Sequence, residues 1–516
     1  MAKDTAQSIG TRTLRGMLWS YGSFAGVRLS SLLTTAILAR LLVPRDFGLI
    51  ALAMTFMAFL DMLQGLGVGE ALVVVDQREL HDQAETAFLI SAVSGLVLWL
   101  VSAGLGPVAA AFFHQPRLVE VLPALGLTFF LYGLGSTHYA LAMKGIDFRS
   151  RTAAELADAV VRGGVGVVLA LLGAGVWSLV VGYIAGTAAM TAVVWRLVAW
   201  RPAFRPRRAH MRSLLGFGGS LTGVGIMAAF LSQFDNGVVG RVLGATQLGF
   251  YSIANRLPYL FIISLAAATG QVLFPAFATL DGAEMKRGFL LSLRYTAAVA
   301  LPLTAILVVL AEPLTVAVFG PRWRPAVPAT QVMCLWALMS PISMVCGNAF
   351  KARGRAFLLF MLAIPQAAAL VVGSLLLVHQ GIVAVAWVQA GIAIAAQLVT
   401  LWIAYRLVDL TLRPVLMAMV PPLIASGVLA ALLLVIKHEV PSPWPAVVVG
   451  AGCGGALYIG LTRLLMPDLF GQLHRMAFPG RVDGSQPEPP PASGGNAPAS
   501  AVPSAAEGTE SVRPPV

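Results

Sequence analysis

The stretch "LARLLVPRDFGLIALA" at residues 38–53 is partly repeated 201 residues later as "VGRVLGATQLGFYSIA" at residues 239–254. Identical residues of the two copies include Arg40 with Arg241, Leu42 with Leu243 and Gly48 with Gly249. Farther along, "FFHQPRLVEVLP" at 112–123 resembles "VFGPRWRPAVP" at 318–328. Two extended matches in the same order predict an internal repeat rather than a chance recurrence of apolar letters.

The composition is that of an integral membrane protein. Of the 516 residues, 58% are apolar and only 11% are charged, and the mean hydropathy is +0.82. Soluble domains carry about 25% charged residues. The three cysteines, Cys334, Cys346 and Cys453, lie in apolar runs without metal-ligand spacing, so they are interpreted as core residues.

Apolar runs long enough to cross a bilayer predict fourteen membrane spans. They are expected near residues 17–41, 47–74, 85–111, 118–142, 154–173, 176–198, 214–240, 249–276, 289–311, 327–349, 357–378, 382–404, 415–436 and 445–466. The first run lacks a cleavage site and is expected to remain as a helix.

The distribution of positive charge predicts the orientation. With the N-terminus inside the cell, the inner segments hold 23 of the 35 Lys and Arg residues. The densest cluster, "WRLVAWRPAFRPRRAHMR" at 195–212, is then cytoplasmic, as the positive-inside rule requires. A net charge of +12 therefore indicates anionic lipid headgroups rather than nucleic acid as the partner.

These features predict the domain organisation. The 201-residue shift covers six spans, so both copies cross the membrane in the same direction, and sites of transporters often lie between such repeats. The expected parts are a cytoplasmic N-terminus (1–15), an N-lobe of spans one to six (16–200), a basic cytoplasmic linker (201–213), a C-lobe of spans seven to twelve (214–405), spans thirteen and fourteen (406–467) and a Pro/Ala/Ser-rich disordered cytoplasmic tail (468–516).

Several stretches taken together resemble one family. They are "ILARLLVPRDFGLIALA", "GVWSLVVGYIAG" (175–186), "VVGRVLGATQLGFYSIANRL", "GQVLFPAFATL" (270–280) and "VFGPRWRPAVPA" (318–329). The set, which covers roughly residues 10–466, is similar to the Wzx-type polysaccharide flippases of the multidrug/oligosaccharidyl-lipid/polysaccharide exporter superfamily, near the succinoglycan and xanthan exporters.

The resemblance implies an all-α polytopic fold, with two six-helix lobes around a central cavity and two extra C-terminal helices. It implies that the cargo is a polyprenyl-diphosphate-linked oligosaccharide, which crosses a bacterial cytoplasmic membrane from the inner to the outer leaflet. Such transport serves the assembly of exopolysaccharide, capsule or O-antigen, with a polysaccharide polymerase and co-polymerase as expected partners. Both termini are expected in the cytoplasm.

Polar residues inside the spans are the candidate site residues, because they are costly in hydrocarbon. In span one, Arg28, Ser31 and Thr35 follow Tyr21 on one helix face. Arg28 is the expected diphosphate ligand, since a guanidinium binds phosphate oxygens in a bidentate manner. The alternative is a structural pair with Asp61, Glu70 or another helix.

Arg256 and Asn255 in span eight are further candidates for binding the glycan or its phosphates. Asp235 in span seven and Asp61 in span two are the candidates for coupling transport to a proton or a sodium ion. No other cofactor is expected. Alternatively, Asp235 is the fixed partner of Arg256.

Two other polar groups are interpreted as structural. Glu155, Asp158 and Arg162 in span five are spaced so that they compensate one another. Arg40 and Arg241, with their matched glycines, are expected to fix how adjacent helices of each lobe meet.

Competing functions are a multidrug or cation antiporter, or a lipid II flippase, on the same fold. An enzyme such as a polymerase or ligase is not expected, because the longest outer loop spans only residues 312–326 and has no catalytic cluster.

Overall fold

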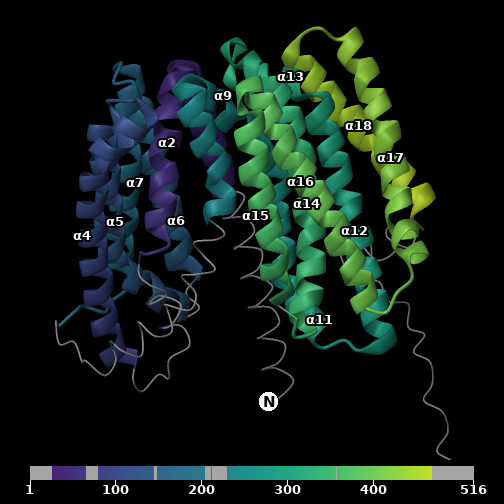
Figure 1. Ribbon diagram of the computed structural model, residues 1–516, viewed down its shortest axis with the longest axis horizontal. Helices are drawn as coiled ribbons and strands as arrows, with labels where there is room; N and C mark the ends of the chain where they lie inside the picture. The colour runs from purple at the N-terminus through teal and green to yellow at the C-terminus, as the bar shows by residue number, and fades with distance from the viewer. Residues whose placement is uncertain are drawn as a thin grey trace, which may run out of the picture. The chain divides into compact units, whose positions relative to one another are not determined.

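A computed structural model shows the fold of the chain (Figure 1) and describes residues 26–64, 72, 80–144, 148–203, 211, 229–355 and 357–467. Within these ranges the chain is helical and contains no strand. The predicted cytoplasmic N-terminus and C-terminal tail lie outside the described residues, as does most of the basic linker. The described helices belong to one compact unit that ends at Pro467.

The first group of helices, called here the N-lobe helices, is formed by the early part of the chain. Its members are a helix at 26–41, α2 (Pro44–Asp61), α4 (Leu80–Phe113), α5 (Leu118–Lys144), α6 (Phe148–Leu171) and α7 (Val176–Leu197). Helix α4 packs along α5, α6 packs along α7, and α5 also contacts α7. The helix at 26–41 lies against α6, where Leu38 joins Ala170 in a small apolar cluster.

The second group, the C-lobe helices, follows the basic linker. It comprises a helix at 229–242, α9 (Gly244–Ala254), α10 (Arg256–Pro258), a π-helical turn η2 (Tyr259–Ile263), α11 (Ser264–Ala278), α12 (Gly282–Val309), α13 (Ala311–Phe319), η3 (Pro321–Ala326), α14 (Val327–Ala352), α15 (Phe357–Leu377), η4 (Val378–Gln380) and α16 (Ile382–Leu407). Helix α14 is the centre of this group, in contact with α11, α12 and α16.

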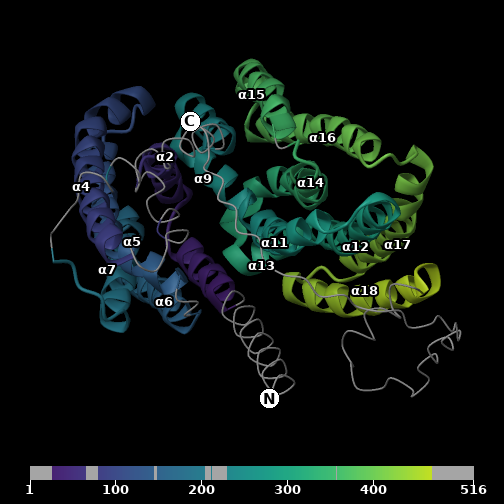
Figure 2. The same ribbon diagram turned by 90° about the horizontal axis from the view of Figure 1, so that it is seen from below.

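Two further helices, α17 (Leu412–Glu439) and α18 (Pro443–Leu465), pack on the C-lobe. Helix α17 lies along α12, and α18 contacts α13 and α17 (Figure 2). Their outer faces carry large apolar side chains; Leu423 is 56% exposed, Val448 66% and Leu464 79%. Only a lipid environment accepts such a surface, so this is a multi-pass membrane protein.

Nine of the described helices are long and apolar enough to cross a bilayer. They coincide with nine of the fourteen expected spans. The other five expected spans are incomplete in the described residues, are more polar, or are interrupted, so the number fourteen stays a prediction.

Two expectations differ from the structure. Span eight is not one continuous helix, because it breaks at Asn255 and passes through a π-helical turn. Pro258 has no N–H to bond the carbonyl of Ala254, which explains a break at this point. Residues 312–326, expected as a loop, form α13 and η3, separated by Gly320 with a φ of +103°.

Candidate functional site

The repeated segments meet each other where α2 lies beside α9 (Figure 1). A Cβ atom at Gly48 would overlap the carbonyl oxygen of Ala245, and one at Gly249 would overlap that of Pro44. Ala245 is the counterpart of Pro44 under the 201-residue shift, so the two contacts are equivalent. Each glycine therefore lets the opposite helix start approach to backbone contact.

The repeated arginines also reach across to the other lobe. Arg40 donates to the carbonyl oxygens of Ala317 and of Val318, the latter at 3.2 Å. Arg241 contacts the His114 ring and lies 5.2 Å from the centre of the Phe112 ring. Val318, Phe112 and His114 belong to the second pair of matching segments, and Ala317 directly precedes it. The expectation that the arginines join helices within one lobe was therefore wrong, because they join the two lobes.

Two more contacts close the same end. The indole N–H of the fully buried Trp323 donates to the carbonyl of Ala39 at 2.8 Å, and Arg322 donates to the carbonyl of Leu42 at 2.9 Å. The contacts of the two glycines, of Arg40 and Arg241, and of Trp323 and Arg322 all lie at or near helix ends. They close the two lobes against each other at one end. We call this end the closed end.

A cavity of about 180 Å³ lies between the helix at 26–41, α6, α7 and α10. We call it the cation pocket. Its lining consists of Val27, Arg28, Ser31, Thr34, Thr35, Leu38, Asp158, Ala159, Arg162, Ser178, Leu179, Tyr183 and Arg256. Four of the five predicted substrate-binding residues therefore line one cavity. The fifth, Asn255, is adjacent to Arg256 in the chain but is not part of the lining.

The polar groups of this pocket are connected. Arg256 donates from Nη2 to the hydroxyl of Thr35 at 3.2 Å, and that hydroxyl donates to the carbonyl of Ser31 at 2.8 Å. The guanidinium of Arg28 lies 5.6 Å from the centre of the Tyr259 ring, a cation–π distance. Arg256 belongs to α10, so it is the C-lobe residue of a pocket otherwise built from the N-lobe.

Helix breaks are tolerated at membrane depth where the irregular backbone is buried or lines a cavity. The break between α9 and α11 meets this condition, since it carries Arg256 into the pocket.

Arg162 lines the pocket together with Asp158, although both were predicted to be structural. Its Nη2 atom lies 2.7 Å from Oδ1 of Asp158, as the four-residue spacing predicted, and its guanidinium lies 4.2 Å from the centre of the Tyr183 ring. Glu155 instead accepts hydrogen bonds from Tyr139 and Arg151, at 2.7 and 2.8 Å. Among the described residues, three guanidinium groups and one carboxylate therefore line the pocket, and this positive surplus suits a diphosphate.

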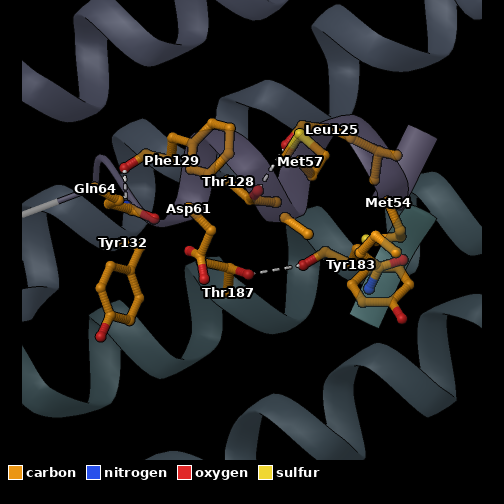
Figure 3. Close-up of a pocket in the computed structure, with 12 residues that line it drawn as sticks. Met54, Met57, Asp61, Gln64, Leu125, Thr128, Phe129, Tyr132, Tyr183 and Thr187 are labelled. Atoms are coloured by element: carbon orange, nitrogen blue, oxygen red, sulfur yellow. Dashed lines mark hydrogen bonds between the residues drawn. The ribbon is translucent and has the colours of Figure 1, made fainter. Parts of the chain in front are cut away.

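Asp61 lines a second cavity, of about 330 Å³, shown in Figure 3. We call it the Asp61 pocket. It is lined by Met54, Met57, Ala58, Asp61, Gln64, Leu125, Thr128, Phe129, Tyr132, Tyr183, Thr187 and Gln233. Tyr183 belongs to both cavities, so they are neighbours. Arg28 and Asp61 therefore line different pockets.

Asp235 lies apart from both pockets. Its side chain is 3% exposed, and the hydroxyl of Tyr251 lies 2.7 Å from its Oδ2 atom and 3.1 Å from Oε1 of Gln389. Arg256 hydrogen-bonds to Thr35 instead. The alternative in which Arg256 is the fixed partner of Asp235 was therefore wrong.

Comparison with known proteins relates this arrangement to polysaccharide assembly. The chain is 27% identical over 476 residues to the succinoglycan biosynthesis transport protein ExoT of Rhizobium meliloti, which covers 90% of this chain and 95% of ExoT. It is 24% identical to the lipopolysaccharide biosynthesis protein WzxC of Escherichia coli K12, over 67% of this chain and 71% of WzxC.

Among solved structures, the lipid II flippase MurJ in an inward closed conformation has the same fold. The TM-score is 0.71 at 13% identity, over 88% of this chain and 100% of MurJ. An inward-facing multidrug transporter of the MATE family matches with a TM-score of 0.58 at 17% identity, over 74% of this chain and 95% of that chain. These likenesses confirm the predicted fold class.

A family model described as "Polysaccharide biosynthesis protein" matches residues 37–328, a range that contains both copies of the repeat, the closed end, the lining of the Asp61 pocket and the cation-pocket residues from Leu38 onward. The family expected from the sequence motifs is thereby confirmed: this chain belongs to the polysaccharide biosynthesis protein family.

Proposed function

We propose that this protein moves a polyprenyl-diphosphate-linked oligosaccharide from the inner to the outer leaflet of a bacterial cytoplasmic membrane, for the assembly of exopolysaccharide, capsule or O-antigen. The observation that carries the proposal is the cation pocket. It lies between the lobes of a membrane protein, and it combines Arg28, Arg162 and Arg256 with the hydroxyls of Ser31 and Thr35.

The physical need for such a pocket follows from its cargo. A diphosphate bearing sugars cannot cross about 30 Å of hydrocarbon unaided, because its charges and hydroxyls would lose their hydration. Guanidinium groups replace that hydration with charge-assisted hydrogen bonds, while the polyprenyl chain stays in the lipid. Two lobes that separate at one end and then at the other expose the pocket to each side in turn.

The comparisons support a transporter rather than an enzyme. ExoT is named a transport protein for succinoglycan biosynthesis, and WzxC is named for lipopolysaccharide biosynthesis. MurJ, whose name specifies a lipid-linked cargo, has the same fold. A lipid II flippase is therefore the second candidate, since it requires the same diphosphate chemistry. A MATE-type antiporter is the third, on fold alone.

The positive-inside rule supports cytoplasmic termini, and with them the closed end lies on the outer side of the membrane. The structure then corresponds to an inward-facing arrangement. Membrane lipids and the lipid-linked glycan are the direct partners in this proposal. A polysaccharide polymerase and co-polymerase act on the glycan after its transfer. A proton or sodium ion at Asp235 or Asp61 is proposed to couple the two access states.

Replacement of the pocket arginines tests the proposal. Arg28→Ala and Arg256→Ala each remove charge-assisted hydrogen bonds of about 1.5–3 kcal/mol, so glycan export is expected to fall about tenfold to a hundredfold at normal membrane abundance. Arg406→Ala is the matched control, because Arg406 stacks on Trp402, away from both pockets. Export measured in cells without another flippase decides the question. Undiminished export in both pocket variants would contradict the proposal.

A further inference from the structure

The Asp61 pocket has a composition that the diphosphate does not explain. It contains a carboxylate, which repels phosphate, yet it adjoins the cation pocket at Tyr183. Its walls are formed by residues of α2, α5 and α7. Gln233 is the described lining residue that comes from the C-lobe. In Figure 3, Asp61 and Thr187 point toward the same part of the pocket.

The polar groups of this pocket are arranged to receive hydroxyl groups. Asp61 has no hydrogen-bond or ion-pair partner among the described residues. Gln64 is anchored by its amide nitrogen, which donates to the carbonyl of Phe129 at 2.9 Å, so its own carbonyl oxygen remains an acceptor. Gln233 is anchored in the opposite sense: its carbonyl oxygen accepts from Asn236 at 2.9 Å, which leaves its amide nitrogen as a donor.

The remaining lining supplies flat apolar surface. Phe129, Tyr132 and Tyr183 provide aromatic rings, and Met54 and Met57 provide flexible apolar contacts. The hydroxyl groups of Thr128 and Thr187 already donate to carbonyls of their own helices, at 2.6 and 3.0 Å. Among the described residues, the pocket thus offers a carboxylate, an amide acceptor and an amide donor beside aromatic rings, two of which carry hydroxyls. A pyranose ring, with hydroxyls that donate and accept, matches this set.

We infer that the Asp61 pocket is the subsite for the first sugar of the lipid-linked glycan, and that it selects a neutral hexose. The inference rests on the proposed function, which places the diphosphate in the adjoining cation pocket. A sugar attached directly to that diphosphate reaches the neighbouring cavity at Tyr183. A sugar with its own carboxylate is disfavoured, because like charges placed together without a counterion are costly.

This assignment differs from the coupling of transport to an ion at Asp61. An acceptor of sugar hydroxyls changes which ligand binds, whereas a coupling site changes how transport depends on the ion gradient. The two roles therefore predict different phenotypes for Asp61→Asn, which keeps the shape of the side chain and removes its charge.

The experiment measures binding to the purified full-length protein in detergent. The three probes are polyprenyl diphosphate, polyprenyl-diphosphate glucose and polyprenyl-diphosphate galacturonic acid. The wild-type protein is expected to bind the glucose probe about tenfold more tightly than either of the others. Asp61→Asn is expected to weaken binding of the glucose probe about tenfold, leave polyprenyl diphosphate unchanged and bring the two sugar probes within about threefold of each other.

The controls separate failure of the subsite from failure of the proposed function. Thr400→Val is the control, because Thr400 lines neither pocket and its hydroxyl donates to a carbonyl within α16. Gln64→Leu repeats the test if Asp61→Asn does not fold. If the sugar preference persists in the Asp61 and Gln64 variants, the subsite is wrong while the diphosphate site stands. If the wild-type protein binds none of the three probes, the proposed function is wrong and the subsite falls with it.

Discussion

At the scale of single residues, the three pocket arginines differ in what compensates their charge. Arg162 is paired with Asp158, whereas Arg256 has no carboxylate partner among the described residues and donates to the neutral Thr35. Arg28 stacks on the ring of Tyr259. An anion in the pocket gains more from Arg256 than from Arg162, because Asp158 already competes for Arg162. Arg162 in turn holds Asp158, whose unpaired charge would repel phosphate.

Asp235 provides a residue-scale prediction. Its carboxylate is buried with Tyr251 and Gln389 and has no cationic partner among the described residues, which makes it a candidate for binding an ion. If Asp235 is the coupling site, Asp235→Asn removes the dependence of glycan transport on a proton or sodium gradient. Transport into proteoliposomes with and without each gradient measures this effect.

Tyr251→Phe is the control for Asp235→Asn. It removes the hydrogen bond to the carboxylate but keeps the carboxylate itself, so it is expected to cost about 1–3 kcal/mol of stability while gradient dependence persists. An Asp235→Asn protein that still responds to the gradient would show that Asp235 is a structural residue of the C-lobe core.

The residues of the cation pocket were largely predictable, and the reason is physical. Arg28, Ser31 and Thr35 stand out because polar groups are costly in an apolar helix, and their spacing places them on one helix face. Arg162 was missed because an acidic residue four positions away satisfies it locally. Its role in the pocket depends on which way α6 faces, and this direction is a property of the packing rather than of the local sequence.

At the scale of elements, α2 and α9 explain why the repeat contains a glycine. Their mutual contact has no room for a Cβ atom on either helix, and opposing carbonyls occupy that space. Small residues permit such close approach between membrane helices. The sequence revealed the repeat but not this partner, because a match between two segments does not tell whether they touch each other.

Gly48→Ala is expected to open the closed end. The added methyl group collides with the backbone of α9, a collision that no side-chain rotation relieves, and overpacking of this kind costs about 1–3 kcal/mol. A cysteine at Ser31 in the cation pocket should then react faster with a membrane-impermeant thiol reagent added from outside, in a Cys453→Ser background. The rate of labelling measures the effect.

The control for Gly48→Ala is Gly391→Ala in α16, where an added Cβ atom meets nothing within 4 Å. It should leave the labelling rate at Ser31 unchanged. Equal labelling rates in Gly48→Ala and Gly391→Ala, at equal membrane abundance, would mean that the glycine contact does not hold this end closed.

The break after α9 shows a limit of sequence reasoning at the same scale. The apolar composition predicted a continuous span over 249–276. Composition alone does not tell whether the helix in such a span is continuous. Pro258 is the signal that marks the interruption, because it removes one hydrogen bond of the helix. The position of the interruption matters, because it places Arg256 of α10 in the lining of the cation pocket.

At the scale of the whole molecule, the described lining of each of the two pockets combines N-lobe walls with one C-lobe residue. Arg256 completes the cation pocket, and Gln233 completes the Asp61 pocket. Movement of the lobes therefore changes the composition of both pockets. A ligand that contacts both lobes favours the arrangement in which these residues converge, and it loses those contacts when the lobes separate. Ligand binding and lobe movement are therefore coupled through the pocket residues themselves.

This linkage predicts that fixing the closed end stops transport but not binding. Cysteines at Arg40 and Val318, joined by a cleavable bifunctional thiol reagent in the Cys453→Ser background, would tie the lobes where Arg40 donates to the Val318 carbonyl at 3.2 Å. Glycan export should cease on cross-linking and return on cleavage, while the purified cross-linked protein still binds polyprenyl diphosphate. The same reagent on cysteines at Glu312 and Arg324, an ion pair within the C-lobe at 3.7 Å, should leave export unchanged. Export that continues in fully cross-linked protein would mean that the cargo crosses without separation of the lobes at this end, and alternating access would then be the wrong mechanism.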